Sequence, residues 1–134
     1  MVVARGALQG GARVIQLRDK IREKGIQLPL AHTLLELCQE YNALLIINDH
    51  ADLAVAVGAG GLHVGQRDLP VAEARMVLYP WQLVGRSNNT VEEATLSEAQ
   101  EADHVAVGPI YPTTTKDTGK PLVRLETLRQ VKEK

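Results

Sequence analysis

A buried-type strand that ends in polar residues constrains the fold of this chain more than any other feature. Residues 44–47 carry four branched apolar side chains without alternation, and an amide, a carboxylate and an imidazole follow at 48–50. An apolar run of this kind is typical of a parallel strand that is covered on both faces. In folds built from parallel strands, ligands bind where the carboxyl ends of the strands meet. The polar residues after this run are therefore a candidate site.

Four other short apolar segments end in a similar way, so we predict five strands. They cover residues 13–17, 44–48, 62–65, 83–86 and 105–108. From the second strand on, the strand ends lie 17, 21 and 22 residues apart. This spacing is short and regular, and it requires crossover helices on one side of the sheet, as in a barrel wall. We therefore expect parallel strands whose polar ends form one shared rim.

Helical patterns lie before, between and after the predicted strands. The predicted helices cover residues 1–12, 29–41, 52–57, 70–78, 90–102 and 122–131. Pro29 suits the first turn of the second helix, so residues 18–27 before it are predicted as a charged loop at the rim. Asp52 is the expected cap of the third helix. Thr90 and Glu93 have the spacing of a capping box, which predicts where the fifth helix begins.

These elements predict a single α/β domain, residues 1–134, that forms an incomplete TIM-type (β/α)8 barrel. A doubly wound sheet is the competing architecture, but no G-x-G-x-x-G motif follows a predicted strand, and the glycines within 58–61 precede one. A closed barrel usually needs about 200 residues or more, whereas this chain has 134. We therefore expect exposed sheet edges that invite association, and hence a homo-oligomer.

The composition excludes several classes of partner. The formal net charge is −1 and aromatic residues make up 3%, so the chain offers neither a basic field nor a stacking surface for nucleic acid. No segment approaches the roughly 20 apolar residues of a membrane-spanning helix. Cys38 is the single cysteine and lies in an apolar helical pattern, so we expect a buried thiol and a reducing, cytoplasmic setting. Small molecules are the expected ligands.

Two aspartates follow adjacent predicted strands. Asp49 comes directly after the second strand, and Asp68 comes three residues after the third. Carboxylates from neighbouring strand ends can bind one hard cation, and Mg²⁺ favours a few carboxylates together with phosphate oxygens and water. The alternative is that each aspartate only caps the helix that follows it. Both interpretations stay open at this point, with Mg²⁺ as the candidate cofactor.

Basic and hydroxyl side chains come from both ends of the strand order. Arg18 and Lys20 follow the first strand, whereas Thr113, Thr115 and Lys116 follow the last. Guanidinium and ammonium groups neutralise phosphates, and hydroxyls and backbone amides at a turn can hold them. The alternatives are a solvated charge run after the first strand and an ordinary polar loop after the last.

Other polar side chains near the strand ends suit recognition better than nucleophilic catalysis. Gln16, Asn48 and Ser87 could contact the amine and ring nitrogens of a heterocycle. We assign no catalytic role to His50 or His63, and we expect His63 to be a hydrogen-bonded core residue because it lies within a strand. The sequence contains no Ser-His-Asp, Cys-His or zinc-type spacing. Positioning and charge stabilisation are therefore the expected means of catalysis.

Five short motifs follow the predicted strands. They are QLRDK at 16–20, IIND at 46–49, GLHVGQ at 61–66 with Asp68, GRS at 85–87 and GPIYPTTTK at 108–116. In this order and spacing they resemble the thiamine phosphate synthase family, and the resemblance covers nearly all of the chain. It implies a (β/α)8-barrel enzyme that joins an aminopyrimidine pyrophosphate to a thiazole phosphate. It also implies a dissociative reaction, in which pyrophosphate leaves a pyrimidine methyl carbon and the thiazole nitrogen captures the resulting cation.

The resemblance implies a role for each matching position. The residues that would hold the pyrimidine pyrophosphate are Gln16, Arg18, Lys20, Asn48, Ser87 and Lys116. The residues that would bind Mg²⁺ are Asp49 and Asp68, and those that would bind the thiazole phosphate are Thr113 and Thr115. Among them, Arg18, Ser87 and Lys116 are the expected catalytic residues.

The chain also departs from the family pattern. We expect it to begin inside the family's first helix and to end after the sixth strand, so the first strand, the last two strands and a glycine-bearing phosphate loop are unmatched. Asn89 stands where many members have a histidine, which disfavours the related thiazole tautomerases. Three hypotheses follow: a thiamine phosphate synthase, a non-catalytic module that binds the pyrimidine pyrophosphate, and a tautomerase-like paralogue.

Overall fold

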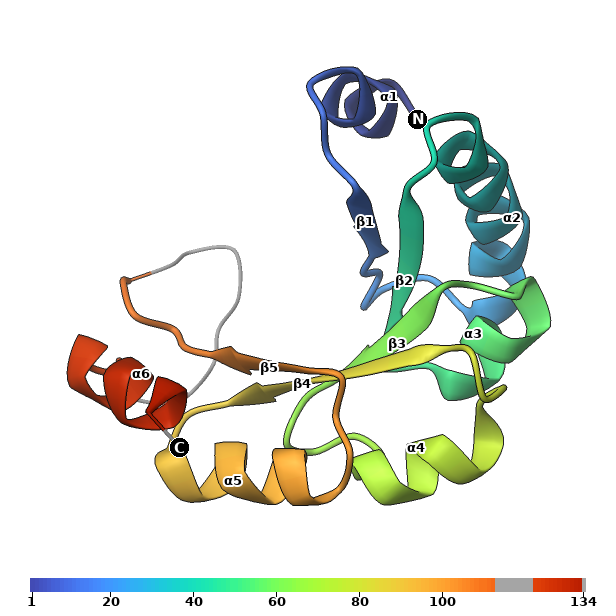
Figure 1. The fold of residues 1–134 in the computed structure, drawn as a ribbon. Helices are drawn as coiled ribbons and strands as arrows, with labels where there is room; N and C mark the ends of the chain where they lie inside the picture. The colour runs from blue at the N-terminus through green and yellow to red at the C-terminus, as the bar shows by residue number, and fades with distance from the viewer. Residues whose placement is uncertain (113–121, 134) are drawn as a thin grey trace.

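The computed structural model describes residues 1–112 and 122–133. Within this part of the chain, one parallel sheet has the strand order β1-β2-β3-β4-β5, so each strand pairs with the next one along the chain. The strands are β1 (Val14–Leu17), β2 (Leu44–Asn48), β3 (Gly61–Val64), β4 (Leu83–Asn88) and β5 (His104–Val107). The sheet curls into an open half-barrel (Figure 1). The incomplete TIM-type barrel predicted from the sequence is confirmed.

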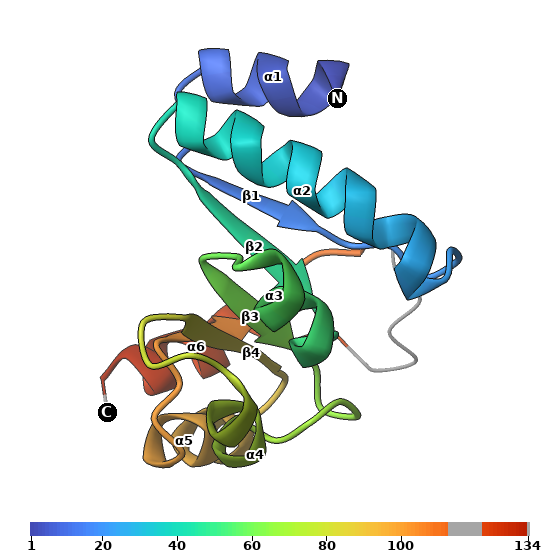
Figure 2. The same ribbon diagram turned by 90° about the vertical axis from the view of Figure 1, so that its right-hand side faces the viewer.

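Helices connect the strands and lie along the convex face of the sheet. They are α1 (Val2–Gln9), α2 (Lys24–Glu40), α3 (Ala51–Val57), α4 (Val71–Val77), α5 (Val91–Ala99) and α6 (Leu125–Lys132). In Figure 2, α2 and α3 lie in front of the strands, and α4 and α5 lie below β3 and β4. In the described ranges, no helix has the length and apolarity needed to cross a membrane.

An aliphatic layer between the sheet and the helices forms the core. Leu45 and Ile47 of β2 and Leu62 and Val64 of β3 are fully buried, as is Val84 of β4. Small and branched side chains from α2, α3 and α4 pack against them. Because side chains alternate along a strand, the residues between these buried positions face the concave side of the half-barrel. The core therefore determines which residues point toward the concave side of the half-barrel, which we call the cup.

The main difference from the prediction lies after β1. The predicted loop over 18–27 is shorter, because α2 begins at Lys24 and Pro29 lies inside the helix rather than in its first turn. The Asp19 carboxylate accepts the backbone N–H groups of residues 21–22 at 2.9 and 3.0 Å. This side-chain turn reverses the chain early and lets the helix start ahead of the proline.

Two predicted helix caps have different outcomes. The α3 helix begins at Ala51 with His50 at its N-cap position, so Asp52 lies within the first turn and is not the cap. Its carboxylate accepts the Leu53 N–H at 2.9 Å and pairs with Lys24 Nζ at 2.7 Å. The cap before α5 is confirmed, because Thr90 Oγ1 accepts the N–H of Glu93 at 3.1 Å. Gly58, in the left-handed conformation, ends α3.

We predict that Gly61→Ala destabilises the sheet. A Cβ at this position would lie 3.0 Å from the Leu83 carbonyl carbon on β4 and closer still to its oxygen. Backbone cannot move away as a side-chain end can, so we expect a loss of about 1–3 kcal/mol. Gly25→Ala is the matched control, since nothing lies within 4 Å of a Cβ there and alanine favours the helix. Urea unfolding measures both, and equal midpoints for the two variants would contradict the prediction.

Candidate functional site

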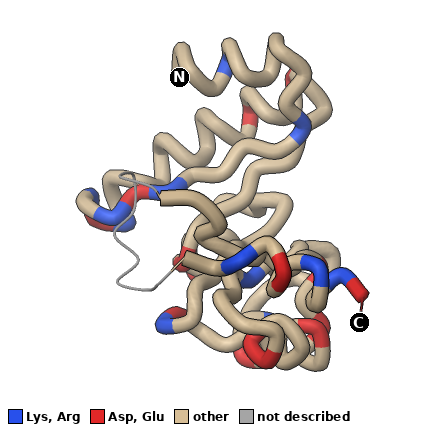
Figure 3. Tube along the Cα trace, turned by 90° about the vertical axis from the view of Figure 1, so that its left-hand side faces the viewer, with Lys and Arg blue, Asp and Glu red and all other residues tan. Residues whose placement is uncertain are grey.

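The carboxyl ends of β1, β2 and β3 open onto a cleft of about 680 Å³. Its walls are the charged segment that leads from β1 into α2 and the residues that follow β2 and β3. Figure 3 shows this concentration of acidic and basic residues on the connection between β1 and α2. The cleft therefore lies where ligands bind in folds of parallel strands.

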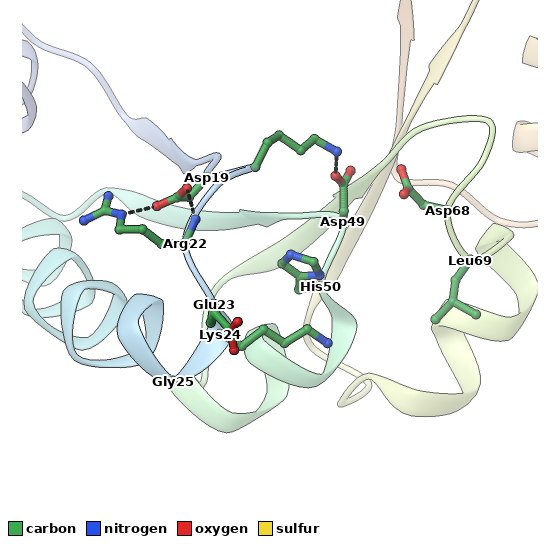
Figure 4. Close-up of a pocket in the computed structure, with 10 residues that line it drawn as sticks. Asp19, Arg22, Glu23, Lys24, Gly25, Asp49, His50, Asp68 and Leu69 are labelled. Atoms are coloured by element: carbon green, nitrogen blue, oxygen red, sulfur yellow. Dashed lines mark hydrogen bonds and ion pairs between the residues drawn. The ribbon is translucent and has the colours of Figure 1, made fainter.

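Asp49 is the central side chain of this cleft. Its backbone has a φ of 65° and its N–H donates to the His63 carbonyl oxygen at 2.8 Å, which extends the pairing of β2 with β3. A left-handed conformation is strained for a residue other than glycine, and it persists only where the surroundings enforce it. Here it directs the carboxylate toward Lys20, whose ammonium forms an ion pair with it (Figure 4).

The electrostatic setting keeps Asp49 ionised. Burial raises the pKa of this carboxyl, but hydrogen bonds with Lys20 and Asp68 and the positive charge of Lys20 outweigh it, so the pKa is lowered. The side chain of Asp49 is only 9% exposed, whereas that of Lys20 is 48% exposed. A shielded carboxylate thus lies next to a half-exposed cation.

Asp68 faces Asp49 across the cleft (Figure 4). Its Oδ2 accepts the N–H of Gly65 at 2.8 Å, which fixes the turn that follows β3. The structure therefore brings together the two predicted carboxylates and one predicted cation. No group of three or more His, Cys, Asp or Glu side chains that could hold a metal occurs in residues 1–112 and 122–133. A cation here would take two protein carboxylates and draw its other ligands from water or substrate.

A second cluster lies on the concave face of β3, β4 and β5. His63 Nε2 lies 2.8 Å from Ser87 Oγ, and His63 Nδ1 lies 3.1 Å from His104 Nε2. The expectation that His63 is hydrogen-bonded is correct, but the ring faces the cup and is partly exposed rather than buried in the core. His104 was not singled out in the sequence. His63 pairs with Gly85, and Gly85 pairs with His104. This strand register is the information that could have identified His104.

The other described candidates lie along the same rim. Gln16 of β1 and Arg18 just after it are exposed, and Asn48 ends β2 in register with His63. Thr113, Thr115 and Lys116 lie outside the described residues.

Arg86, near the end of β4, does not point to the rim, where the pattern of polar strand ends predicts it. The strand continues to Asn88, two residues beyond the prediction, so Arg86 turns to the convex side and is 7% exposed. Its guanidinium donates to the side-chain oxygens of Gln66 at 3.1 Å and Gln100 at 3.2 Å. Of the neighbours Arg86 and Ser87, only Ser87 faces the cup.

Together, the fold and the site define a (β/α)-barrel protein with carboxylates, cations and hydrogen-bonding groups at the carboxyl ends of its strands. The family model described as "Thiamine monophosphate synthase" matches residues 1–134. The chain belongs to this family.

Individual relatives are consistent with that assignment. A thiamine-phosphate synthase of Methanospirillum hungatei is 42% identical over 132 residues, which are 98% of this chain and 64% of the relative. One from Synechocystis is 46% identical over 121 residues, 90% of this chain and 35% of the relative. A solved thiamine phosphate pyrophosphorylase from Pyrococcus furiosus superposes with a TM-score of 0.88 at 35% identity, covering 97% of this chain and 61% of that one. The chain thus spans between about a third and two thirds of the length of these proteins.

We predict that Asp19→Asn changes how stability depends on pH. Backbone hydrogen bonds from Arg22 and Ile21 lower the pKa of Asp19 from 3.8 to about 2. A lowered pKa in the folded state stabilises the fold above the unfolded value, and this contribution is lost as the pH falls from about 4 toward 2. The variant should therefore be less stable than the unchanged chain near neutral pH, and the difference should shrink in acid.

Urea unfolding between about pH 6 and pH 3 measures this difference. The matched control is Glu36→Gln, an exposed acid on α2, for which the difference from the unchanged chain should stay nearly constant. A gap for Asp19→Asn that is equally wide at both ends of the range would contradict the prediction.

Proposed function

We propose that this chain carries the site that joins an aminopyrimidine pyrophosphate to a thiazole phosphate, giving thiamine phosphate and pyrophosphate. Membership of the family supports the reaction class. The observation that carries the proposal is the group formed by Lys20, Asp49 and Asp68, because three successive strand ends supply it to one cleft. Both signs of charge are needed to bind a diphosphate together with the cation that neutralises it.

The proposed chemistry matches the side chains that the cup contains. The bond between the pyrimidine methyl carbon and the pyrophosphate oxygen breaks, and the electron pair leaves with the pyrophosphate. The thiazole nitrogen then forms the new bond to carbon. Such a reaction needs charge stabilisation and alignment rather than a protein nucleophile. In line with this, the single cysteine, Cys38, is buried in the core.

We assign the predicted roles as part of this proposal. The pyrimidine pyrophosphate would contact side chains on β1, β2 and β4 and on the segment that follows β1, namely Gln16, Arg18, Lys20, Asn48 and Ser87. Arg18 and Ser87, with Lys116, would stabilise the leaving group. Thr113 and Thr115 would hold the thiazole phosphate.

The acid pair is the proposed site for Mg²⁺. Asp49 and Asp68 come from adjacent strand ends, face each other and line one cleft, and the lowered pKa of Asp49 provides the charged oxygens that Mg²⁺ prefers. When bound, Mg²⁺ would neutralise charge on the departing pyrophosphate. Lys20 would then exchange its contact with Asp49 for one with the phosphate, which its exposed position allows.

The tautomerase-like alternative is less well supported. Asn89 Nδ2 donates to the Gly108 carbonyl oxygen at 2.5 Å, and the Asn89 N–H donates to Glu93 Oε2 at 2.6 Å. This residue therefore ties the end of β4 to α5 and to the segment after β5. A side chain engaged in this way links elements of the fold, and it is an amide where a tautomerase would use an imidazole.

The first test of the proposed function is synthesis of thiamine phosphate by the full chain with both substrates and Mg²⁺. We predict that Asp49→Asn and Asp68→Asn each lower the rate by about 100-fold, because each removes a charged carboxylate from the proposed Mg²⁺ site. Asp52→Asn is the matched control, since this carboxylate is exposed and pairs with Lys24. It should retain the rate.

The result of the assay separates the hypotheses. If the unchanged chain binds inorganic pyrophosphate with Mg²⁺ in calorimetry but forms no thiamine phosphate, it is a binding module and the proposed activity is wrong. If it forms thiamine phosphate and Asp49→Asn is as active as Asp52→Asn, the activity stands but the assigned metal site does not.

We also propose that the chain associates with a second copy through α1 and the edge strand β1. Val2 and Val3 on α1 are 88% and 86% exposed, and Val14 on β1, the next element along the chain, is also exposed. Exposed branched side chains next to an open strand edge favour a partner surface.

The prediction is a dimer or larger assembly in light scattering at micromolar concentration. Val3→Glu should shift it toward the monomer by placing a charge in the apolar contact. Met76→Glu provides the matched control, because Met76 is 85% exposed on α4, away from this surface, and should leave the assembly intact. A monomer for the unchanged chain, or an equal effect of both substitutions, would refute the proposed interface.

A further inference from the structure

Two histidines meet on the concave face of the sheet because a glycine lies between them. His63 on β3, Gly85 on β4 and His104 on β5 are aligned in register across three neighbouring strands. A Cβ at Gly85 would overlap the His104 ring. The missing side chain thus leaves room for the two imidazoles to stack, with ring centroids 5.2 Å apart and planes inclined by 25°.

Hydrogen bonds connect this pair to a residue of the proposed site. His104 Nε2 lies 3.1 Å from His63 Nδ1, and His63 Nε2 lies 2.8 Å from Ser87 Oγ. The backbone of Ser87 is itself held, because Gln66 Nε2 donates to its carbonyl oxygen at 2.7 Å. The hydrogen bonds therefore run from His104 on β5 to His63 on β3 and on to Ser87 on β4.

A neutral imidazole has one N–H donor and one acceptor nitrogen. The row of hydrogen bonds from His104 through His63 to Ser87 can therefore have only two donor-to-acceptor directions. In the first, His104 Nε2–H donates to His63 Nδ1, and His63 Nε2–H donates to Ser87 Oγ. In the second, the Ser87 hydroxyl donates to His63 Nε2, and His63 Nδ1–H donates to His104. Only the first leaves the hydroxyl hydrogen of Ser87 available for a ligand.

We propose that His104 is a positioning residue that holds His63 in its Nε2–H tautomer, so that Ser87 presents its hydroxyl hydrogen to an anionic phosphate group in the cup. The inference rests on the proposed function for the identity of that anion. An anion needs a donor, and the opposite direction would present it with the lone pairs of Ser87. His104 contacts no phosphate in this arrangement and acts through His63.

The position of the row suits this role. The carbonyl oxygen of His63 accepts the Asp49 N–H at 2.8 Å, so the backbone of His63 is bonded directly to that of an acid of the proposed Mg²⁺ site. Asn48, the residue before Asp49 on β2, is the pairing partner of His63. Ser87 thus reaches the cup beside the groups that would bind a pyrophosphate and its cation.

The direct test is the tautomer of His63, measured from the ¹⁵N shifts of its ring nitrogens at about pH 8, where an ordinary imidazole is neutral. We expect His63 to carry its proton on Nε2 in the unchanged chain. In His104→Phe, which keeps an aromatic ring but removes the group that holds Nδ1 as an acceptor, we expect the fraction of the Nδ1–H tautomer to rise. Gly85→Ala should act likewise, because it displaces the His104 ring without removing its nitrogen atoms.

The second measurement is the affinity for inorganic pyrophosphate with Mg²⁺. His104→Phe and Gly85→Ala should each weaken binding by about tenfold, the value of one hydrogen bond to a charged group. His32→Phe is the matched control, since it changes an exposed histidine on α2 and should affect neither readout.

The two readouts distinguish failure of this inference from failure of the proposed function. A proton on His63 Nδ1 in the unchanged chain, or an unaltered tautomer in both variants, overturns the role of His104 whatever the chain binds. Equal pyrophosphate affinity of the variants and the unchanged chain also overturns it, and leaves the proposed function intact. If the unchanged chain binds no pyrophosphate, the proposed function fails and with it the anion assigned to Ser87, while the tautomers still decide whether His104 controls His63.

Discussion

The register of the parallel sheet is the constraint on which both the core and the site depend. Successive side chains along a strand point to opposite faces, so a slip of one residue would exchange the faces. Ile47 is fully buried against the helices, while its neighbour Asn48 lies on the opposite face. The same register aligns Asn48 with His63, Gly85 and His104 across four strands. The aliphatic core thus sets the positions of polar groups that it never touches.

Features that depend on local pattern could be predicted from the sequence. Unalternated aliphatic runs between turn residues marked the strands, because a strand under helices must be apolar over most of its length. The acids Asp49 and Asp68 could be assigned to one rim from strand order alone, since parallel strands end at the same edge. The cap formed by Thr90 followed from its spacing to Glu93. In each case one short segment, or the common direction of the strands, contained the whole signal.

Features that depend on contacts between segments could not be predicted in the same way. The early start of α2 depends on how Asp19 binds its own backbone, which competes with the usual preference of Pro29 for the first turn. Arg86 was grouped with the polar rim, but two further residues of strand turn it toward Gln100. His104 lies 41 residues from His63, and nothing local in either segment indicates that their rings meet. Such pairs become visible only after the register is known.

The ion pair in the cleft shows how the fold can prepare a site for charge. Burial of the Asp49 carboxylate carries a desolvation penalty. Lys20 helps to offset this penalty, yet its side chain is about half exposed, so its contact with Asp49 is screened by water and easily exchanged. A deeply buried lysine would hold the acids together more firmly but could not leave them. Placing the cation on the exposed segment after β1, and the acids on the rigid strand ends, therefore keeps the carboxylates in position while leaving them open to another positive charge.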